Sequence, residues 1–323
     1  MNYKPLIIVL GEPYSVFPEI FFKLFQSFIR KKIKTPIIII GSLDLLKKQM
    51  KFFNYKFKIN LIEEKEIKKI KDNKKINLID VNYNFKRIFE KKSKYSNKYI
   101  NKSFSLALKI IKKNQTVGMV NGPVSKSKFL KRKFRGITEY LSYNTNSKNV
   151  AMVIFNEKLS VSPLTTHIPI KNVTKEINRK LIHNKILVIN KFYKSVLKIN
   201  PRIAVLGLNP HCETINKFNE DSKILKPAIE SLKKRNIKIS GPYPADTFFM
   251  EKNYSKYNIV VGMYHDQVLT PIKTIFGFNA INITVGLPFL RVSPDHGPNE
   301  SMVGKNKSNP TSLYKAISFL DRR

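Results

Sequence analysis

The chain has 323 residues, which is enough for one large or two ordinary domains. Hydrophobic residues make up 42% of it, which supports a packed core and excludes a disordered protein. The formal net charge of +38 suggests nucleic-acid binding. We nevertheless expect no specific nucleic-acid partner, because the lysines are spread along the whole chain together with the other residues that AT-rich codons encode. The densest basic run, 126–135, is interpreted as a solvated face.

Strand-like and helix-like patterns alternate from the start of the chain. In the first part of the chain we predict a strand at 6–10, a helix at 18–29, a strand at 36–40, a helix at 43–52 and a solvated helix at 63–75. A helix at 97–113 and a strand at 116–120 follow, and then one long helix at 173–200. The last part is predicted to contain a strand at 203–207, a helix at 220–235, a strand at 258–263 and a helix at 308–320. This alternation predicts an α/β fold with a parallel sheet covered on both faces.

The sequence gives no sign of a membrane or secreted protein. No apolar stretch approaches the ~20 residues that a membrane-spanning helix needs. The first residues lead straight into a strand, without the apolar core of a secretion signal. The single cysteine, Cys212, excludes an intrachain disulfide. We therefore predict a cytoplasmic protein with no membrane partner.

Three of the five histidines, His167, His211 and His265, each follow an apolar, strand-like run. Ligands of open α/β sheets bind at the carboxyl ends of the strands. Three imidazoles placed there could hold one divalent metal ion and leave positions open for a substrate. The alternative is three unrelated loop histidines, and the shared context favours the metal site. Cys212 could add a fourth ligand, but we interpret it as a small space-filling side chain.

Other loops carry more polar and turn-forming residues than packing requires. The segment 122–126 follows a strand and is expected to open a helix, where backbone N–H groups could bind an anion. Asp246 ends a rigid turn and is either a helix N-cap or a catalytic group. Lys273, Asn282 and Arg291 lie on or near the last predicted strands and are candidate ligands for a phosphate or carboxylate.

Several of these loops match a known family in sequence and in order. The matching blocks are Asn121-Gly122-Pro123-Val124-Ser125-Lys126, Thr165-Thr166-His167-Ile168-Pro169, Gly207-Leu208-Asn209-Pro210-His211, Gly241-Pro242-Tyr243-Pro244-Ala245-Asp246-Thr247, Met263-Tyr264-His265-Asp266-Gln267 and the run from Gly286 to Gly297. They resemble the 4-hydroxythreonine-4-phosphate dehydrogenase family of vitamin B6 biosynthesis. The blocks extend across nearly the whole chain, and together they are highly specific.

The resemblance implies a three-layer α/β/α subunit of two domains, similar to the isocitrate and isopropylmalate dehydrogenases. Residues 1–130 with about 285–323 would form a discontinuous first domain. About 131–284 would form a second domain that carries the metal ligands and the dimer contacts. The active site would lie in the cleft between the domains, in a homodimer whose subunits share it.

The resemblance also implies roles for individual residues. The metal ligands would be His167, His211 and His265, contributed from both chains of the dimer. The substrate contacts would be Thr138, Lys273, Asn282 and Arg291. Asp246 and Asp266 would orient a ligand histidine or move a proton, with Lys273 as a further catalytic group. Since the sequence has no Gly-x-Gly-x-x-Gly motif, NAD would bind to loops within 286–305, at Gly286, Pro288, Asp295 and Gly304.

The reaction implied by the family has two steps. NAD, or NADP, oxidises the 3-hydroxyl of 4-phosphooxy-L-threonine, and the product then loses its carboxylate to give 3-amino-2-oxopropyl phosphate for pyridoxal 5'-phosphate biosynthesis. The resemblance implies a divalent metal, zinc, magnesium or cobalt, which acts as a Lewis acid on the substrate hydroxyl. Lys273 and Arg291 supply positive charge for the phosphate or carboxylate.

The sequence departs from the family pattern in several loops. The family's first loop, Gly-Asp/Glu-Pro-Ala-Gly-Ile-Gly-Pro-Glu, has lost both interior glycines and contains the bulky Tyr14 and Phe17. If those glycines allow a positive φ or a close approach, the loop must be rebuilt. Ile137 replaces a substrate-contacting histidine. The segment 214–218 replaces a glycine-rich stretch, and 301–305 lacks the acidic residue of Asp-Ile-Ala-Gly-Lys.

Two explanations of these departures compete. The chain is either a drifted enzyme that keeps a weaker form of the family activity, or a paralogue. A paralogue would act on another phosphorylated hydroxy acid or a diol, or would bind metal without catalysis. We favour the drifted enzyme, because the metal and anion ligands that the reaction needs most are retained.

Overall fold

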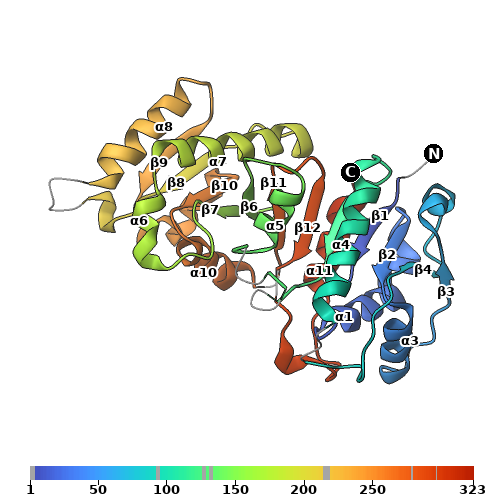
Figure 1. Cartoon of the computed structure of the whole chain (residues 1–323). Helices are drawn as coiled ribbons and strands as arrows, with labels where there is room; N and C mark the ends of the chain where they lie inside the picture. The colour runs from blue at the N-terminus through green and yellow to red at the C-terminus, as the bar shows by residue number, and fades with distance from the viewer. Residues whose placement is uncertain are drawn as a thin grey trace. The chain divides into compact units, whose positions relative to one another are not determined.

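The computed structural model describes residues 4–91, 95–125, 129–130, 134–213, 219–277, 279–295 and 297–323. The chain divides into two compact units (Figure 1). Unit 1 comprises 1–133 and 289–323, and unit 2 comprises 134–288. Most of the predicted basic run 126–135 (126–128, which includes Lys126, and 131–133), the segment 214–218 and His296 of the last matching block lie outside the described residues.

Unit 1 contains a parallel sheet with the strand order β3-β4-β2-β1-β5-β12. The strands are β1 (Leu6–Val9), β2 (Ile37–Gly41), β3 (Ile59–Leu61), β4 (Ile76–Asp80), β5 (Gly118–Asn121) and β12 (Leu290–Pro294). The first two are runs of apolar residues that are buried throughout. Such runs are typical of strands that are covered on both faces.

Helices cover both faces of this sheet. They are α1 (Phe17–Leu24), α2 (Arg30–Lys32), α3 (Leu43–Phe52), α4 (Ser96–Lys112) and α11 (Thr311–Asp321). Helix α1 contacts α3 and α11, whereas α4 contacts β1 and β2. The crossovers β1–α1–β2 and β4–α4–β5 run in opposite directions along the sheet, so right-handed connections place α1 and α4 on opposite faces. Unit 1 therefore has the three layers predicted for the α/β/α fold.

Unit 2 contains strands in the order β11-β6-β7-β10-β8-β9. They are β6 (Ala151–Phe155), β7 (Ser160–Pro163), β8 (Ile203–Leu206), β9 (Ile239–Tyr243), β10 (Ile259–Gly262) and β11 (Ile281–Val285). Strand β6 is antiparallel to both β11 and β7, and β7, β10, β8 and β9 are parallel. The predicted parallel sheet was wrong for β6, because the short link 156–159 joins it to β7 as a hairpin rather than through a helix.

The helices of unit 2 are α5 (Ile137–Asn144), α6 (Val173–Glu176), α7 (Arg179–Phe192), α8 (Lys226–Lys233), α9 (Ala245–Phe248) and α10 (His265–Phe276). Helices α7 and α8 contact each other, and α10 contacts β7 and β10. A buried cluster joins α9 and α10 to the sheet through Phe248, Val260 and Val268. This core fixes the carboxyl ends of β7 and β10, where two of the candidate histidines lie.

Helix boundaries show where local chemistry overrides hydrophobic periodicity. The prediction of one helix over 173–200 was wrong. Helix α6 ends at Glu176, and the Asn178 side chain accepts a hydrogen bond from Leu181 N at 2.9 Å, which caps a new helix. A π-helical turn, Tyr193–Leu197, then ends the segment. The segment 63–75 forms only a short 3₁₀ helix, Glu64–Lys69, before β4.

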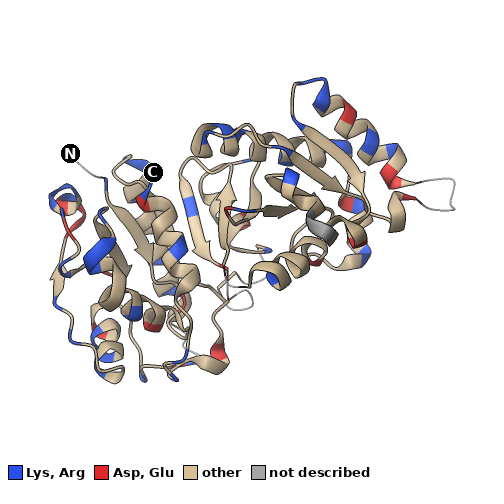
Figure 2. Ribbon diagram, turned by 180° about the vertical axis from the view of Figure 1, so that it is seen from behind, with Lys and Arg blue, Asp and Glu red and all other residues tan. Residues whose placement is uncertain are grey.

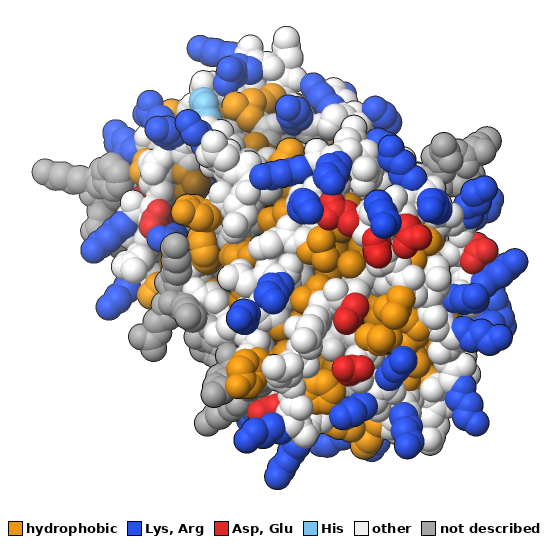
Figure 3. Space-filling model, turned by 45° about the vertical axis from the view of Figure 1, so that its right-hand side comes forward, with side chains coloured by type: hydrophobic (Ala, Val, Ile, Leu, Met, Phe, Trp, Pro, Cys, Tyr) orange, Lys and Arg blue, Asp and Glu red, His pale blue; other side chains and the backbone are white. Residues whose placement is uncertain are grey.

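Basic side chains are distributed over both units. Figure 2 shows lysine and arginine on the helices and loops of each, with acidic residues between them. On the face drawn in Figure 3 the blue side chains are interspersed with apolar, acidic and neutral ones and do not form a single patch. This distribution is typical of a solvated surface and does not favour a nucleic-acid interface. None of the described helices is long and apolar enough to cross a membrane.

Candidate active site

Three neighbouring strands of unit 2 each end in a loop with a candidate metal ligand. Strand β10 lies between β7 and β8 and is parallel to both, so His167, His265 and His211 follow strand ends at the same edge of the sheet. Gln267 ties two of these loops together. Its Nε2 donates to the Gly207 carbonyl at 2.7 Å, and its Oε1 accepts from Met263 N at 2.7 Å. The fold thus aligns the three histidine-bearing loops.

His167 and His265 lie close together. Their ring centroids are 5.7 Å apart, and both side chains are at least partly exposed. Asp266 lies beside His265, with Oδ1 2.7 Å from the ring Nδ1. His167 has a φ of 55°, in the left-handed region that non-glycine residues seldom occupy. Backbone strain of this kind is concentrated at functional sites.

His211 also has a positive φ, 54°, and a buried carboxylate holds its loop. Asp221, which is fully buried, accepts hydrogen bonds from Leu208 N at 2.7 Å and from Asn209 N at 3.0 Å. His211 itself is exposed. Within the described residues, no three His, Cys, Asp or Glu side chains are grouped closely enough to hold a metal ion. A single chain therefore brings together His167 and His265, but not the complete predicted triad.

Cys212, next to His211, is buried. Burial, and then the charge of Asp221, raise the pKa of its thiol to about 11. A raised thiol pKa caused by burial is typical of an unreactive structural cysteine. A Cβ placed on Gly207 would come within 2.6 Å of the Cys212 Sγ, so the thiol fills the space beside that glycine. These observations support the interpretation of Cys212 as a packing residue.

Helix α5 and strand β11 bring together two of the predicted substrate contacts. Thr138 Oγ1 lies 3.1 Å from Thr284 Oγ1. Asn282 precedes Thr284 by two residues, so both side chains point to the same face of the sheet. The Oδ1 atom of Asn282 is buried and accepts no hydrogen bond from the described part of the chain. An acceptor in this condition is suited to a ligand that donates a hydrogen bond.

A carboxylate that the sequence reasoning did not single out lies between these groups and the histidines. Glu139 follows Thr138 in the first turn of α5, and its Oε1 lies 3.5 Å from Thr166 Oγ1. Its Oε2 is buried and has no hydrogen-bond partner among the described residues. Lys185 of α7 donates a hydrogen bond to the Val150 carbonyl at 2.6 Å. Burial lowers the pKa of this lysine, whereas the negative charge of Glu139 acts to raise it. The Gly-Ile-Thr-Glu motif contains the only sequence signal for Glu139.

Arg291, the fourth predicted substrate contact, belongs to unit 1 and is only 1% exposed. Its Nε donates to Oδ1 of Asn121 at 2.7 Å, and Asn121 is 2% exposed. The hydrogen bond connects β12 to β5, which are paired strands. Arg291 thus has a role in holding the sheet together, beside any role toward a substrate.

The altered first loop of unit 1 is closed by packing. Ser15 and Phe17 stand where the family has glycines, and neither has a positive φ. Ser15 Oγ donates to the Glu12 carbonyl at 2.7 Å, and Phe17 is fully buried. A Cβ on Gly122 would lie 2.9 Å from the Phe17 ring and 2.1 Å from the Leu10 carbonyl oxygen. The loop is therefore rebuilt with side chains packed where the glycines would leave space.

The remaining predicted residues are distributed between the two units. Lys273 is exposed in the last turn of α10, and Asp246 lies inside the first turn of α9, where its Oδ1 accepts from Thr247 N at 2.9 Å. Pro244 is the N-cap of α9, so the N-cap interpretation of Asp246 was wrong. The predicted cofactor residues Gly286 and Pro288 lie in unit 2, and Asp295 and Gly304 lie in unit 1. Gly286 and Gly304 have φ values of 93° and 78°.

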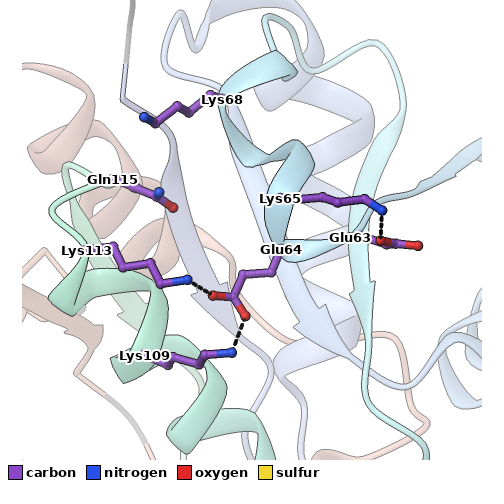
Figure 4. A pocket seen from close by; sticks show the side chains of 7 residues that line it. All are labelled: Glu63, Glu64, Lys65, Lys68, Lys109, Lys113 and Gln115. Atoms are coloured by element: carbon purple, nitrogen blue, oxygen red, sulfur yellow. Dashed lines mark hydrogen bonds and ion pairs between the residues drawn. The ribbon is translucent and has the colours of Figure 1, made fainter.

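A surface cavity of about 450 Å³ in unit 1 contains none of the predicted residues (Figure 4). It is lined by Glu63, Glu64, Lys65, Lys68, Lys109, Lys113 and Gln115. The Glu64 carboxylate bonds to Lys109 and Lys113 at 2.7 and 2.5 Å, and Lys65 pairs with Glu63 at 2.9 Å. Three of its four lysines pair with carboxylates, but Glu64 is shared by two of them, so four lysines and two glutamates leave the lining with a net charge of +2.

Comparison with known proteins identifies the family. The model of the pyridoxal phosphate biosynthetic protein PdxA matches residues 32–320. A 4-hydroxythreonine-4-phosphate dehydrogenase from Sulfurihydrogenibium sp. (strain YO3AOP1) is 36% identical over 97% of this chain and 96% of its own. A D-threonate 4-phosphate dehydrogenase from Salmonella typhimurium is 29% identical over 99% of this chain and 98% of its own.

Solved structures give the same result for the fold. The structure of a putative 4-hydroxythreonine-4-phosphate dehydrogenase from Salmonella typhimurium has a TM-score of 0.83 at 27% identity and covers 99% of both chains. A β-decarboxylating dehydrogenase from Thermococcus kodakarensis, 10% identical, has a TM-score of 0.50 and covers 98% of this chain and 82% of its own, which shows a shared fold alone. The predicted fold class and family resemblance are both confirmed, and the chain belongs to the PdxA family of pyridoxal phosphate biosynthetic proteins.

Proposed function

We propose that the protein is a metal- and NAD(P)-dependent dehydrogenase that oxidises 4-phosphooxy-L-threonine at its 3-hydroxyl and releases 3-amino-2-oxopropyl phosphate. The observation that carries this proposal is the pairing of His167 and His265, 5.7 Å apart, at the carboxyl edge of unit 2 in a chain of this family. The activity takes its name from the relative that matches 97% of the chain.

The histidines fit a divalent metal by type and by spacing. Neutral imidazoles are common ligands of first-row metals. Two imidazoles bound to one tetrahedral ion at ordinary metal–nitrogen distances have ring centroids roughly 5 Å apart, close to the observed separation of His167 and His265. His211 would complete the triad, with ligands supplied from both subunits of a homodimer. When bound, the metal ion would polarise the substrate hydroxyl as a Lewis acid and stabilise the charge that develops during decarboxylation.

The protein's own residues would bind and orient the substrate. Thr138 lies against Thr284, two residues after Asn282 on the same strand, and the buried Oδ1 of Asn282 would accept a hydrogen bond from a substrate donor. Lys273, on the exposed side of α10, would contribute positive charge to the phosphate. Asp266 holds the Nδ1 side of His265, which leaves Nε2 to face the ligand. Asp246 would serve in proton transfer.

The proposed reaction balances with NAD as the oxidant. The C3 hydride passes to the nicotinamide, and the hydroxyl proton is released, so C3 becomes a ketone. The resulting β-keto acid loses carbon dioxide, and a proton replaces the carboxylate on C2. The cofactor would bind to loops that include Gly286, Pro288, Asp295 and Gly304, and the enzyme would work in the cytoplasm.

The alternative substrate is another phosphorylated hydroxy acid. The relative from Salmonella typhimurium is named for D-threonate 4-phosphate, and it matches nearly the whole chain. Ile137 cannot form the hydrogen bond of the histidine that it replaces, which favours a changed or weakened substrate contact.

The test is NADH formation with purified protein and each of the two substrates. We expect turnover of 4-phosphooxy-L-threonine that is abolished by a chelator, restored by added metal, and lost in His211→Ala. Ile137→His should raise its rate if the contact is weakened. Preferential turnover of D-threonate 4-phosphate would favour the alternative, and no turnover of either with NAD or NADP at high enzyme concentration would exclude both dehydrogenase assignments.

A further inference from the structure

Glu139 presents a problem that the proposed reaction does not explain. Its Oε2 is buried and receives no hydrogen bond from any residue that the structure describes. A buried polar atom without a partner is costly, and a carboxylate oxygen more so than a neutral group. Such an atom in a folded protein calls for a hydrogen-bond donor, either a nearby side chain or a ligand. The candidates are the groups around the first turn of α5.

The surroundings of Gly136 show what lies near this oxygen. A Cβ placed on Gly136 would be 3.0 Å from Glu139 Oε2, 3.0 Å from Nδ1 of His167 and 3.1 Å from its Cε1. The carboxylate oxygen and the imidazole nitrogen therefore border the same small space. Gly136 has a φ of −166°, which any residue can adopt. The reason for glycine here is thus room for the two side chains rather than backbone conformation.

At His265 a carboxylate does lie within hydrogen-bonding distance of the ring Nδ1. Its Nδ1 lies 2.7 Å from the Asp266 carboxylate, which directs the opposite ring nitrogen away from that partner. Histidines that bind metals commonly donate their other N–H to a carboxylate, which fixes the tautomer and the ring orientation. The ring centroid of His167 lies 5.7 Å from that of His265, and its Nδ1 and the Glu139 carboxylate both lie beside Gly136.

We propose that Glu139 is a positioning residue: a small rotation of either side chain, across the space beside Gly136, lets Nδ1 of His167 donate a hydrogen bond to Oε2 and so presents Nε2 of that ring to the metal ion. The inference that Nε2 faces a metal ion rests on the proposed function. The inference that Glu139 fixes the tautomer of His167 does not.

The neighbours of Glu139 leave its Oε2 available as a hydrogen-bond acceptor. Thr166 Oγ1 lies 3.5 Å from Oε1, which leaves Oε2 for the imidazole. Lys185 supplies a positive charge whose field reaches Glu139, while its own hydrogen bond goes to the Val150 carbonyl. A buried carboxylate with such a cation nearby is a stronger acceptor than a neutral amide.

The test compares Glu139→Gln and Glu139→Met in metal-free protein. The glutamine keeps the size and an acceptor but removes the charge, and the methionine removes both. NMR of ¹⁵N-histidine-labelled protein, at a pH where the ring is neutral, reports which nitrogen of His167 carries the proton. We expect the Nδ1–H tautomer in the native protein, a partial loss in Glu139→Gln and a larger loss in Glu139→Met. Glu176→Gln, which removes an exposed carboxylate paired with Arg135, is the matched control.

A second readout is the affinity for zinc alone, measured by competition with a chelator. We expect it to fall about 10–100-fold in Glu139→Met and to stay unchanged in Glu176→Gln. If the Glu139 variants do not fold, Gly136→Ala retains the carboxylate, crowds the shared space and should shift the same His167 signal. An unchanged His167 tautomer in folded Glu139→Met or Gly136→Ala overturns the proposal. The NMR experiment needs no turnover. The His167 tautomer can therefore support or overturn this proposal even if the dehydrogenase assay shows no activity.

Discussion

The candidate residues of the two units differ in how they are held. In unit 1, Arg291 is 1% exposed and donates to the equally buried Asn121, and the first loop is filled by Phe17. In unit 2, His167 and His211 are exposed, and the His265 side chain is 37% exposed. Arg291 and Asn121 belong to the interior of a sheet. The unit 2 residues lie where a ligand can reach them.

The difference teaches that a polar residue at a strand end has two distinct uses. A buried one that is hydrogen-bonded to a neighbouring strand stabilises the fold, and its loss leaves a partner unsatisfied. An exposed one, such as His167, is accessible to a ligand instead. Substitutions in the two groups should therefore separate stability from binding.

The largest effect is expected for Arg291→Met. Methionine roughly preserves the buried apolar volume but leaves Oδ1 of Asn121 without its donor. The free energy of unfolding should fall by about 2–3 kcal/mol, measured by urea denaturation. Arg235→Met, which replaces an exposed arginine, should change it by less than about 0.5 kcal/mol. Unchanged stability of Arg291→Met, together with a raised KM, would instead make Arg291 primarily a substrate ligand.

The next effect is expected for Asp266→Asn. The change removes the charge beside Nδ1 of His265 but no buried contact, since the Asp266 side chain is 79% exposed. Zinc affinity should fall about tenfold, while the free energy of unfolding stays within about 0.5 kcal/mol of the native value.

The matched control for that change is Asp44→Asn, which also removes an exposed aspartate from the first turn of a helix, but in unit 1. It should leave zinc affinity unchanged. Equal losses of affinity in both variants would indicate a general effect of net charge rather than orientation of His265.

The sequence predicted the parts of the fold that depend on local pattern. The helix over 43–52 was predicted to the residue, and the strands that precede His211 and His265 were placed to within one residue at each end. The pairing of β6 could not be predicted, because an apolar strand carries no information on its direction. The break after Glu176 depends on a single asparagine cap inside an otherwise helical pattern.

The candidate site was predictable only in part. The alignment of the histidines follows from the rule that parallel strands end at one edge, which a sequence can suggest. Glu139 could not be found in this way, because its significance depends on a space shared with a residue 28 positions later in the chain. The burial of Arg291 was equally hidden, since an arginine in a strand gives no sign of which partner it will meet.

The smallest effect is expected at a cluster that is neither buried nor at the candidate site. Glu64 bonds to Lys109 and Lys113 and so ties the short 3₁₀ helix to α4 (Figure 4). Glu64→Gln should lower the free energy of unfolding by less than about 1 kcal/mol, and less still at high salt, because exposed ion pairs are weak and screened. Glu230→Gln, which breaks a single exposed pair with Lys233, is the control and should have a smaller effect.

The pH dependence of the stability difference between native protein and Glu64→Gln tests whether the charge of Glu64 causes it. The hydrogen bonds from Lys109 and Lys113 lower the pKa of Glu64 from its ordinary value of 4.5. Just below pH 4.5 the unfolded chain therefore binds a proton at Glu64 more readily than the folded protein does, so acid favours unfolding. The stabilisation is fully present above this pH and is lost as the pH falls through the lower pKa of the folded state. A difference between native protein and Glu64→Gln that persists unchanged below that range would show that the glutamine alters packing rather than charge.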